Sequence, residues 1–507
     1  MVSHGGNVPV LFALITELPV GGTGLVSRCA TIGVLPDDTL LEIFSFYVDE
    51  AYEHKNAYRL KQLEVWCTLV HVCRRWRKIV FASPRRLNLR LVCTNRRPVR
   101  KMLDIWPTLP IVVQDGGLRR RPQPHVEDFD NIITALGRRD RVCQISLGIH
   151  SISHFHMCST MMQESFPALT RLNIRSGIDS AMALPNSFLG GSAPRLQSLI
   201  LSCTSFPALP KLLSSPNDLV DLHLYNIPHS GYISPEAMAT CLSSLTKLEF
   251  FNLHFNSPRS CPHQSNGHLS SLTHVDLPAL THFSFRGIDK YIEDFVARIN
   301  APLLKYIRVW FSNQLLFDIS QLAQFIVRGG NFKVHRHAAV VFDTDLAWVR
   351  FFRSQMRADF TAPMFCISST QSEWQLSSLA EVCNSFSSHL RLSSLECLDI
   401  LAFTEPEHWH DDMENIQWLE LLQSFTAVKD LYLCKNLALR LPRALQELTG
   451  ESSREVLPAL QSIFVDDELP LRAVEESIGL FIAARQLSGH PVAIKHWQPD
   501  WDAYYWQ

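Results

Sequence analysis

The chain has 507 residues, of which 46% are hydrophobic and only 19% charged. This composition predicts a folded protein and argues against disorder, and the length allows a short module together with a long repeat array. The formal net charge of −2 gives no whole-molecule reason to expect a nucleic acid or a membrane as partner.

Residues 1–33 match nothing that follows them and are left unassigned. The segment Val8–Val20 is apolar, but no Lys or Arg precedes it and its uninterrupted run is short for a spanning helix. We therefore expect no transmembrane segment, with a signal peptide as the alternative. Gly21–Gly24 resembles a phosphate-binding turn, but the Lys-Ser/Thr pair of such loops does not follow it, so no nucleotide site is predicted.

A first helix is predicted to begin at Leu35-Pro36-Asp37-Asp38. Proline suits the first helical position, and the two carboxylates meet the positive end of the helix dipole. Apolar residues then recur at spacings of three and four, which is more apolar surface than one small helix can hide alone. The residues of this stripe are Leu40, Leu41, Phe44 and Val48, widened by Ile43 and Tyr47.

A second amphipathic run follows the polar stretch Asp49–Gln62 and stops before Pro84. Basic residues from Arg74 to Lys78 occupy one face of this run. Its other face carries Val65, Leu69, Val72, Cys73, Trp76 and Val80.

Three motifs in this region resemble an F-box: Leu-Pro-x-x-x-Leu-Leu-x-Ile-Phe from Leu35, Val-Cys-Arg-x-Trp-Arg from Val72, and Ser-Pro at Ser83. The resemblance covers residues 34–91, with a somewhat long connection between the helices. In that family a three-helix module binds the Skp adaptor of cullin-based ubiquitin ligases. The resemblance implies adaptor contacts at Leu35, Pro36, Leu40, Ile43, Phe44, Val72, Cys73 and Trp76. The module's own core is expected to contain Leu41, Leu69 and Ile79.

The chain is basic after this module. Between Arg74 and Arg141, 17 Lys or Arg stand against six Asp or Glu, but no aromatic residues alternate with them. Solvated loop arginines are therefore favoured over a nucleic-acid patch. Turn-forming pairs such as Trp106-Pro107 and Gly116-Gly117 predict that residues 92–138 are a connecting segment.

From residue 169 onward, one pattern recurs: apolar-x-x-apolar-x-apolar, often with a proline two positions before it. Most spacings between units are near or above those of leucine-rich repeats, which predicts an irregular α/β solenoid over residues 139–495 and a C-terminal tail at 496–507. The nine units are Leu169/Leu172/Ile174, Leu196/Leu199/Leu201, Leu219/Leu222/Leu224, Leu245/Leu248/Phe250, Leu280/Phe283/Phe285, Leu304/Ile307/Val309, Leu395/Leu398/Ile400, Val428/Leu431/Leu433 and Leu460/Ile463/Val465.

The longest gap in the array is predicted to hide further strands at Val334–Phe342 and Pro363–Ser368. Helical spacing at Leu315–Val327 and Trp374–Leu390 predicts an outer layer. The region resembles the leucine-rich-repeat-like tails that follow F-boxes in many fungal proteins, although only Asn436 supplies the asparagine expected after its strand. The predicted fold class is thus α/β, a small all-α F-box module followed by an irregular leucine-rich-repeat-like solenoid.

Side chains that alternate with the buried apolar residues of a strand face outward, and we expect them to contact a partner. Trp310 and Tyr306 are the best single candidates, with partial burial under a neighbouring loop as the alternative. The predicted partner-binding residues are Arg171, Asn173, Asp221, His223, Tyr225, His282, Arg286, Tyr306, Arg308, Trp310, Asp430 and Tyr432.

Signs of catalysis or metal binding are weak. The cluster His408–Asp412 is the most metal-like, but its acidic surroundings suit an exposed loop. His154 and His156, like His335 and His337, repeat its spacing without a carboxylate and are taken as surface or core histidines. No nucleophile elbow, zinc-protease or kinase motif occurs, so we expect no metal, no cofactor and no enzyme.

The sequence thus predicts an interaction protein. Its F-box would bind a Skp-type adaptor and through it a cullin, while the repeats bind a protein substrate that the sequence does not identify. Thirteen cysteines without a C-x-x-C pair favour a reducing compartment, cytoplasmic or nuclear. Two alternatives stay open: an F-box scaffold that acts outside ubiquitylation, and an unrecognised enzyme with its site on the solenoid.

Overall fold

The computed structural model divides the chain into two compact units, residues 1–89 and 90–507. The predicted features at Val8–Val20, Gly21–Gly24 and His408–His410 lie outside the residues it describes. The described residues are 35–53, 65–106, 108–115, 126–178, 182–256, 274–312, 314, 317–329, 335–352, 363–368, 372–387, 392–403, 411–438, 441–446 and 456–499.

The described part of the first unit consists of helices α1 (Asp37–Glu53), α3 (Trp66–Val70) and α4 (Arg74–Ala82). The predicted apolar stripe of the first helix is confirmed, because its four main positions are all buried. The residues expected in the core of this unit, Leu41, Leu69 and Ile79, are buried as well.

The second amphipathic run does not form one continuous helix. It breaks between α3 and α4, where Cys73 has an extended backbone, with φ −156° and ψ 170°. The Cys73 Sγ accepts a hydrogen bond from the backbone N–H of Trp76 at 3.4 Å, so the side chain caps α4. A residue that caps a new helix cannot continue the preceding one, and Val72 and Cys73 are consequently exposed at the break.

The second unit contains a 16-stranded sheet within its described residues. Its strands are parallel, except that β15 is antiparallel to both of its neighbours. In spatial order they are β1 (Leu91–Thr94), β2 (Ile111–Gln114), β3 (Val142–Ile149), β4 (Arg171–Ser176), β6 (Ser198–Ser202), β8 (Asp221–Ile227), β9 (Phe250–Phe255), β11 (His282–Gly287), β13 (Tyr306–Ser312), β16 (Met364–Ser368), β15 (Leu346–Phe352), β14 (His337–Phe342), β17 (Cys397–Ala402), β18 (Asp430–Leu433), β19 (Ser462–Asp466) and β20 (Ala493–Trp497).

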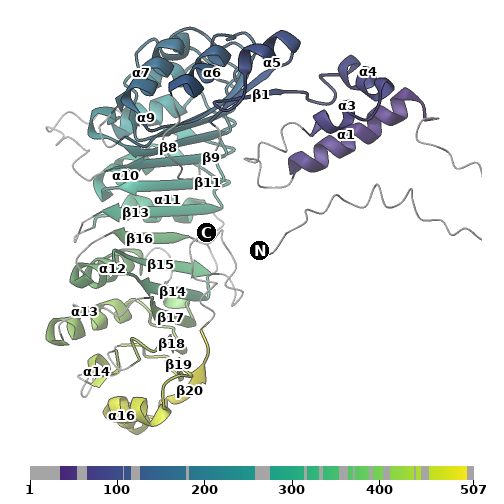
Figure 1. Cartoon of the computed structure of the whole chain (residues 1–507). Helices are drawn as coiled ribbons and strands as arrows, with labels where there is room; N and C mark the ends of the chain where they lie inside the picture. Colours follow the sequence, from purple (N-terminus) through teal and green to yellow (C-terminus); the bar gives the residue numbers. More distant parts are fainter. Residues whose placement is uncertain are drawn as a thin grey trace, which may run out of the picture. The chain divides into compact units, whose positions relative to one another are not determined.

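Helices follow most of these strands, and Figure 1 shows α10 to α13 along the same side of the stacked strands. Two short pairs, β5 (Met182–Ala183) with β7 (Thr204–Ser205) and β10 (Val275–Asp276) with β12 (Ile299–Asn300), lie outside the large sheet. The helices are α5 (Val99–Ile105), α6 (Val126–Leu136), α7 (Ile152–Met161), α8 (Leu209–Leu213), α9 (Pro235–Leu242), α10 (Asp289–Val296), α11 (Ser320–Arg328), α12 (Ser372–Ser387), α13 (Asp411–Gln423), α14 (Leu441–Gln446) and α16 (Leu471–Leu487), with 3-10 turns η3 (Phe188–Gly191), η4 (His229–Gly231) and η6 (Leu392–Ser394).

Burial alternates along the strands of the first half of the array, as the repeated pattern predicts. In β9 and β13, one residue in two is buried and the residues between are partly exposed. The buried positions align from strand to strand, so each repeat stacks its apolar side chains on those of the next. One continuous ladder of this core consists of Leu172, Leu199, Leu222, Phe251, Phe283 and Ile307.

The prediction that residues 92–138 form a connection is wrong. This segment holds α5, β2 and α6, and β1 begins just before it at Leu91. Leu91–Cys93 and Ile111–Val113 are buried and pair in parallel, so they extend the sheet by two strands. In the sequence, the turn-forming pairs fall between these elements.

The predicted repeat unit Leu245/Leu248/Phe250 is wrong by three residues. The sheet register aligns Phe251 with Leu222 and Leu253 with Leu224, so the unit is Leu248/Phe251/Leu253 and Phe250 lies on the other face.

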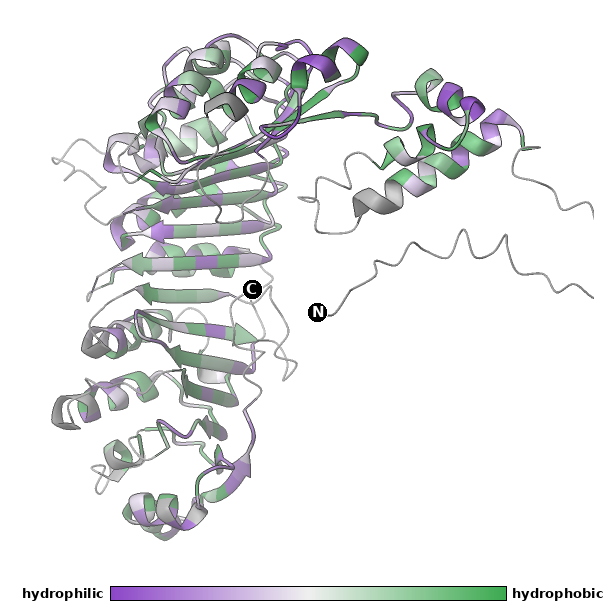
Figure 2. Cartoon of the chain, in the orientation of Figure 1, coloured by the Kyte–Doolittle hydropathy of each residue, from purple (hydrophilic) through white to green (hydrophobic). Residues whose placement is uncertain are grey.

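The long gap in the array holds β14 and β16 within the predicted strand spans, and α11 and α12 overlap the predicted helical spans. The antiparallel strand β15, which was not predicted, runs between β14 and β16. The residues of β14 are all buried, and those of β16 and β15 are buried except at one end. β16 and β14 are accordingly hydrophobic along most of their length (Figure 2).

Candidate functional site

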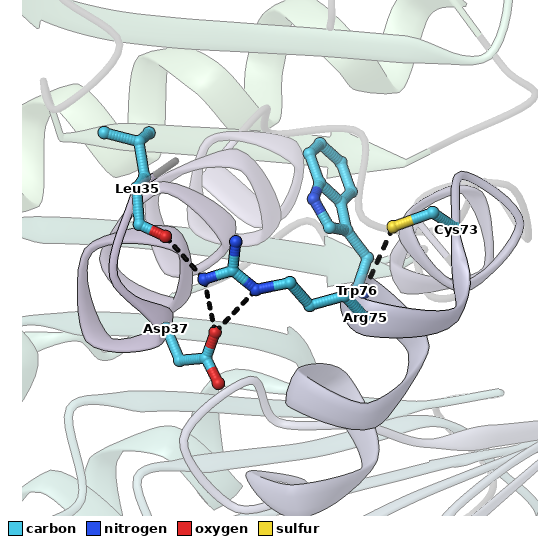
Figure 3. Close-up of polar contacts among 5 residues, drawn as sticks. All are labelled: Leu35, Asp37, Cys73, Arg75 and Trp76. Atoms are coloured by element: carbon cyan, nitrogen blue, oxygen red, sulfur yellow. Dashed lines mark hydrogen bonds and ion pairs between the residues drawn. The ribbon is translucent and has the colours of Figure 1, made fainter. Parts of the chain in front are cut away.

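The first candidate site lies where α1 and α4 begin. Arg75 on α4 donates two hydrogen bonds to Asp37 Oδ1, from Nε at 2.8 Å and from Nη2 at 2.6 Å. Its Nη2 also donates to the backbone carbonyl of Leu35 at 2.5 Å. Figure 3 shows that these contacts bring Leu35 and Asp37 to the same end of α4 as Cys73 and Trp76.

The eight residues implied as adaptor contacts differ in exposure. Leu40 and Phe44 are buried in the core of the unit, so the prediction that their side chains contact a partner is wrong for this conformation. The stripe of α1 turns them inward, and the Phe44 ring packs at 4.6 Å between centroids against Trp76. Three of the other six are exposed, namely Pro36, Val72 and Cys73. The remaining three, Leu35, Ile43 and Trp76, are half-buried.

The second candidate site is the face of the large sheet that carries the partly exposed strand residues, which we call the open face. Its positions on β9, β11 and β13 align in three rows across the strands. These rows are Phe250, His282 and Tyr306; Asn252, Ser284 and Arg308; and His254, Arg286 and Trp310.

The structure gathers most of the predicted partner-binding residues on this open face. Ten of the twelve lie on β4, β8, β11 and β13, whereas Asp430 and Tyr432 lie on β18, with four strands between it and β13. Tyr432 stacks on Phe464 of β19 at 4.4 Å between ring centroids and belongs to a separate group.

Sequence reasoning missed the residues of β9 on the open face, namely Phe250, Asn252 and His254. The misplaced repeat unit assigned Phe250 to the core and left its neighbours without a predicted direction. The signal was present, because Leu248, Phe251 and Leu253 match the repeat pattern equally well.

Aromatic rings form two groups on the open face. Phe250 stacks on His282 at 4.3 Å between centroids, and His282 lies 5.6 Å from Tyr306. His254 makes edge-to-face contacts with Tyr225 at 5.0 Å and with Trp310 at 5.1 Å. Such pairs fix ring orientation, so these rings form a preorganised surface rather than independent side chains.

Hydrogen bonds support the second of these groups, which contains Tyr225 and His254. Asn252 Nδ2 donates to the Tyr225 hydroxyl at 2.8 Å and also contacts His223 Nδ1. His254 Nε2 and Ser284 Oγ are 2.8 Å apart. Burial, reinforced by the positive charges of neighbouring arginines, lowers the pKa of His254 to about 3. This imidazole is therefore neutral at physiological pH and a weak base, so its contact with Ser284 is a structural hydrogen bond.

Another buried polar pair lies farther along the same sheet. His337 Nε2 on β14 is 2.9 Å from Asp399 Oδ2 on β17, and both side chains are buried. Asp399 is 62 positions from His337 along the chain, and the parallel pairing of these two strands brings the side chains together. Within the described part of the chain, no group of three or more potential ligands is placed to hold a metal ion.

No family model matches the sequence, and no curated protein matches it. Among solved structures, it is similar to the leucine-rich repeat-containing protein LegL7 from Legionella pneumophila, with 14% identity and a TM-score of 0.25, over 68% of this chain and 97% of that one. The repeat fold follows from the strand order and register of this chain itself. Among the described residues, no helix is long and apolar enough to cross a membrane.

Proposed function

We propose that this chain is the substrate-recruiting subunit of a cullin-RING ubiquitin ligase. The first unit would bind a Skp-type adaptor, and the open face of the repeats would bind the protein to be modified. The ligase chemistry would reside in other subunits. The observation that carries the proposal is the arrangement of the F-box-like motifs: Arg75 ties the start of α1 to the start of α4, and the motif residues Pro36, Val72 and Cys73 are exposed.

Within the F-box-like motifs, some residues form the core of the unit and others are exposed, which supports the proposal. The inward stripe of α1 supplies the core of the unit, while the helix break at Cys73 supplies exposed apolar surface, with the Val72 side chain 53% exposed. We infer that Val72 and Trp76 are anchors of the adaptor interface, where such residues can each contribute about 2 kcal/mol or more.

The test is a pull-down of purified Skp adaptor with the full-length chain. Combined Pro36→Ala and Val72→Asp substitutions should weaken binding at least about thirty-fold, because two contact positions are lost. Both side chains are exposed, so the fold should survive, which circular dichroism checks. Ile105→Asp, at an exposed apolar position of α5, is the matched control. Unchanged adaptor binding in the double variant would rule out the F-box assignment.

The alternative function is a scaffold that uses the same adaptor contact outside ubiquitylation. Recovery of a cullin together with the purified chain and adaptor favours the ligase role. Adaptor binding without a cullin would favour the scaffold.

A further inference from the structure

Positive charge on the open face is concentrated where β11 meets β13. Arg286 is aligned with Trp310, and Arg308 is aligned with Ser284, so the two arginines lie diagonally across neighbouring strands. None of the nine open-face positions in the three aligned rows of β9, β11 and β13 carries a carboxylate. His254 beside them is neutral at physiological pH, so the arginines are the charged groups of this patch.

These arginines are held in a partly dry environment. Both side chains are half-buried, and the Nε of Arg286 is buried with no hydrogen-bond partner among the residues that the structure describes. The Arg308 guanidinium lies 5.2 Å from the Tyr306 ring centre and 5.4 Å from that of Trp310. A charge held against rings and away from water interacts more strongly with an incoming anion than a fully exposed charge does.

The surroundings favour a peptide over a nucleic acid. A nucleic-acid groove needs cations repeated along the path of the backbone. Here Arg171 on β4 already forms an ion pair with Asp221 on β8 at 4.0 Å. The carboxylates of Asp221 and Glu249 lie at the edge of the sheet where β8 and β9 begin. Two arginines among half-buried rings instead suit a short segment that combines carboxylates with apolar side chains.

We infer that the open face of β9, β11 and β13 binds an acidic peptide segment of the recruited protein. Its carboxylates contact Arg286 and Arg308, and its apolar side chains lie against Phe250, Tyr306 and Trp310. This inference rests on the proposed function: if the repeats bind a protein substrate, the inference specifies the chemistry of the bound segment.

The experiment selects peptides from a displayed random library on the full-length chain. The peptides obtained should be enriched in Asp or Glu together with aromatic or aliphatic residues. Fluorescence anisotropy with a labelled selected peptide then compares variants. Arg286→Gln and Arg308→Gln should each weaken binding about tenfold, since each removes a charge-assisted contact. Arg308→Lys should lose part of that affinity, because lysine lacks the planar fork.

Arg328→Gln provides the matched control, because this exposed arginine lies on α11 and outside the sheet. It should leave the peptide affinity unchanged, and all variants should retain adaptor binding. A failure of the adaptor pull-down in the unmodified chain would therefore overturn the proposed function alone. Selection of no peptide, of peptides without acidic residues, or of peptides that bind the double Arg→Gln variant equally well would overturn the inference. Tighter binding of labelled oligothymidylate than of any selected peptide would overturn it in favour of a nucleic acid.

Discussion

Helix α11 depends for its first turn on a side chain of the preceding repeat. Glu293, on α10, accepts hydrogen bonds from the backbone N–H groups of Gln321 at 2.8 Å and Leu322 at 2.7 Å. The residue before the helix, Ile319, provides no side-chain cap of its own. Because the first N–H groups of a helix have no partner within it, Glu293 takes the place of a local N-cap.

Glu293→Ala should therefore destabilise the repeat unit by about 2 kcal/mol. The loss of an N-cap costs about 0.5–2 kcal/mol, and here two charge-assisted bonds disappear from a half-buried site. Glu293→Gln keeps one acceptor oxygen and should cost about half as much. Urea unfolding measures the difference, and hydrogen exchange at Gln321 and Leu322 localises it. Asp294→Ala, at the exposed neighbouring position, is the control. Equal protection of the two amides in both alanine variants would refute this reasoning.

The pH dependence gives a second readout on Glu293. Burial raises the pKa of this carboxyl above its ordinary value of 4.5, opposed by the two backbone hydrogen bonds and assisted by Asp318 and Asp289. The folded protein thus holds the proton more tightly than the unfolded chain. Stability from this group is fully present below pH 4.5 and falls as the pH rises through the raised pKa. Glu293→Gln should abolish that part of the pH dependence.

Three further predictions follow from burial. Arg485→Met should cost about 3 kcal/mol in urea unfolding, because buried Arg485 donates to backbone carbonyls of the turn before β19. A maleimide should label exposed Cys73 rapidly and leave Cys383 unlabelled in mass spectrometry, since burial raises the pKa of the Cys383 thiol to about 12. A fragment from Arg90 should elute as a monomer in size-exclusion chromatography, whereas one from Asn131 lacks β1 and β2 and should aggregate.

Apolar periodicity made most of the array predictable. Eight of the nine repeat units have the predicted residues buried, because a stacked repeat must bury the same positions in every coil. The ninth, Leu245/Leu248/Phe250, failed at Phe250, because several apolar residues close together allow two alignments of the pattern. Strand β3 carries the same signal in Val142, Ile145 and Leu147 and could have been found. The short strands β1 and β2 were not predicted, because their aligned residues do not follow the repeated apolar pattern.

The candidate sites were predictable only in part. Alternation along a strand indicated which side chains would leave the core, and it placed Tyr306, Arg308 and Trp310 correctly on the open face. It could not indicate which of them would meet. The contact between His254 and Trp310 joins residues 56 positions apart, and it depends on the register of three strands. In the first unit, the break at Cys73 was hidden because the flanking residues continue a helical pattern.

The parallel register keeps core residues and open-face residues in separate rows across these repeats. Leu253, Phe285 and Val309 align across β9, β11 and β13 and are buried against the helices' side. Each is followed directly by an open-face residue, and these residues align in their own row. A substitution in that row alters the charge or shape of the open face while the adjacent core row stays intact. Substitutions at Arg286 therefore should report mainly on binding, whereas truncation of Phe285 one position earlier should cost about 3–5 kcal/mol of stability.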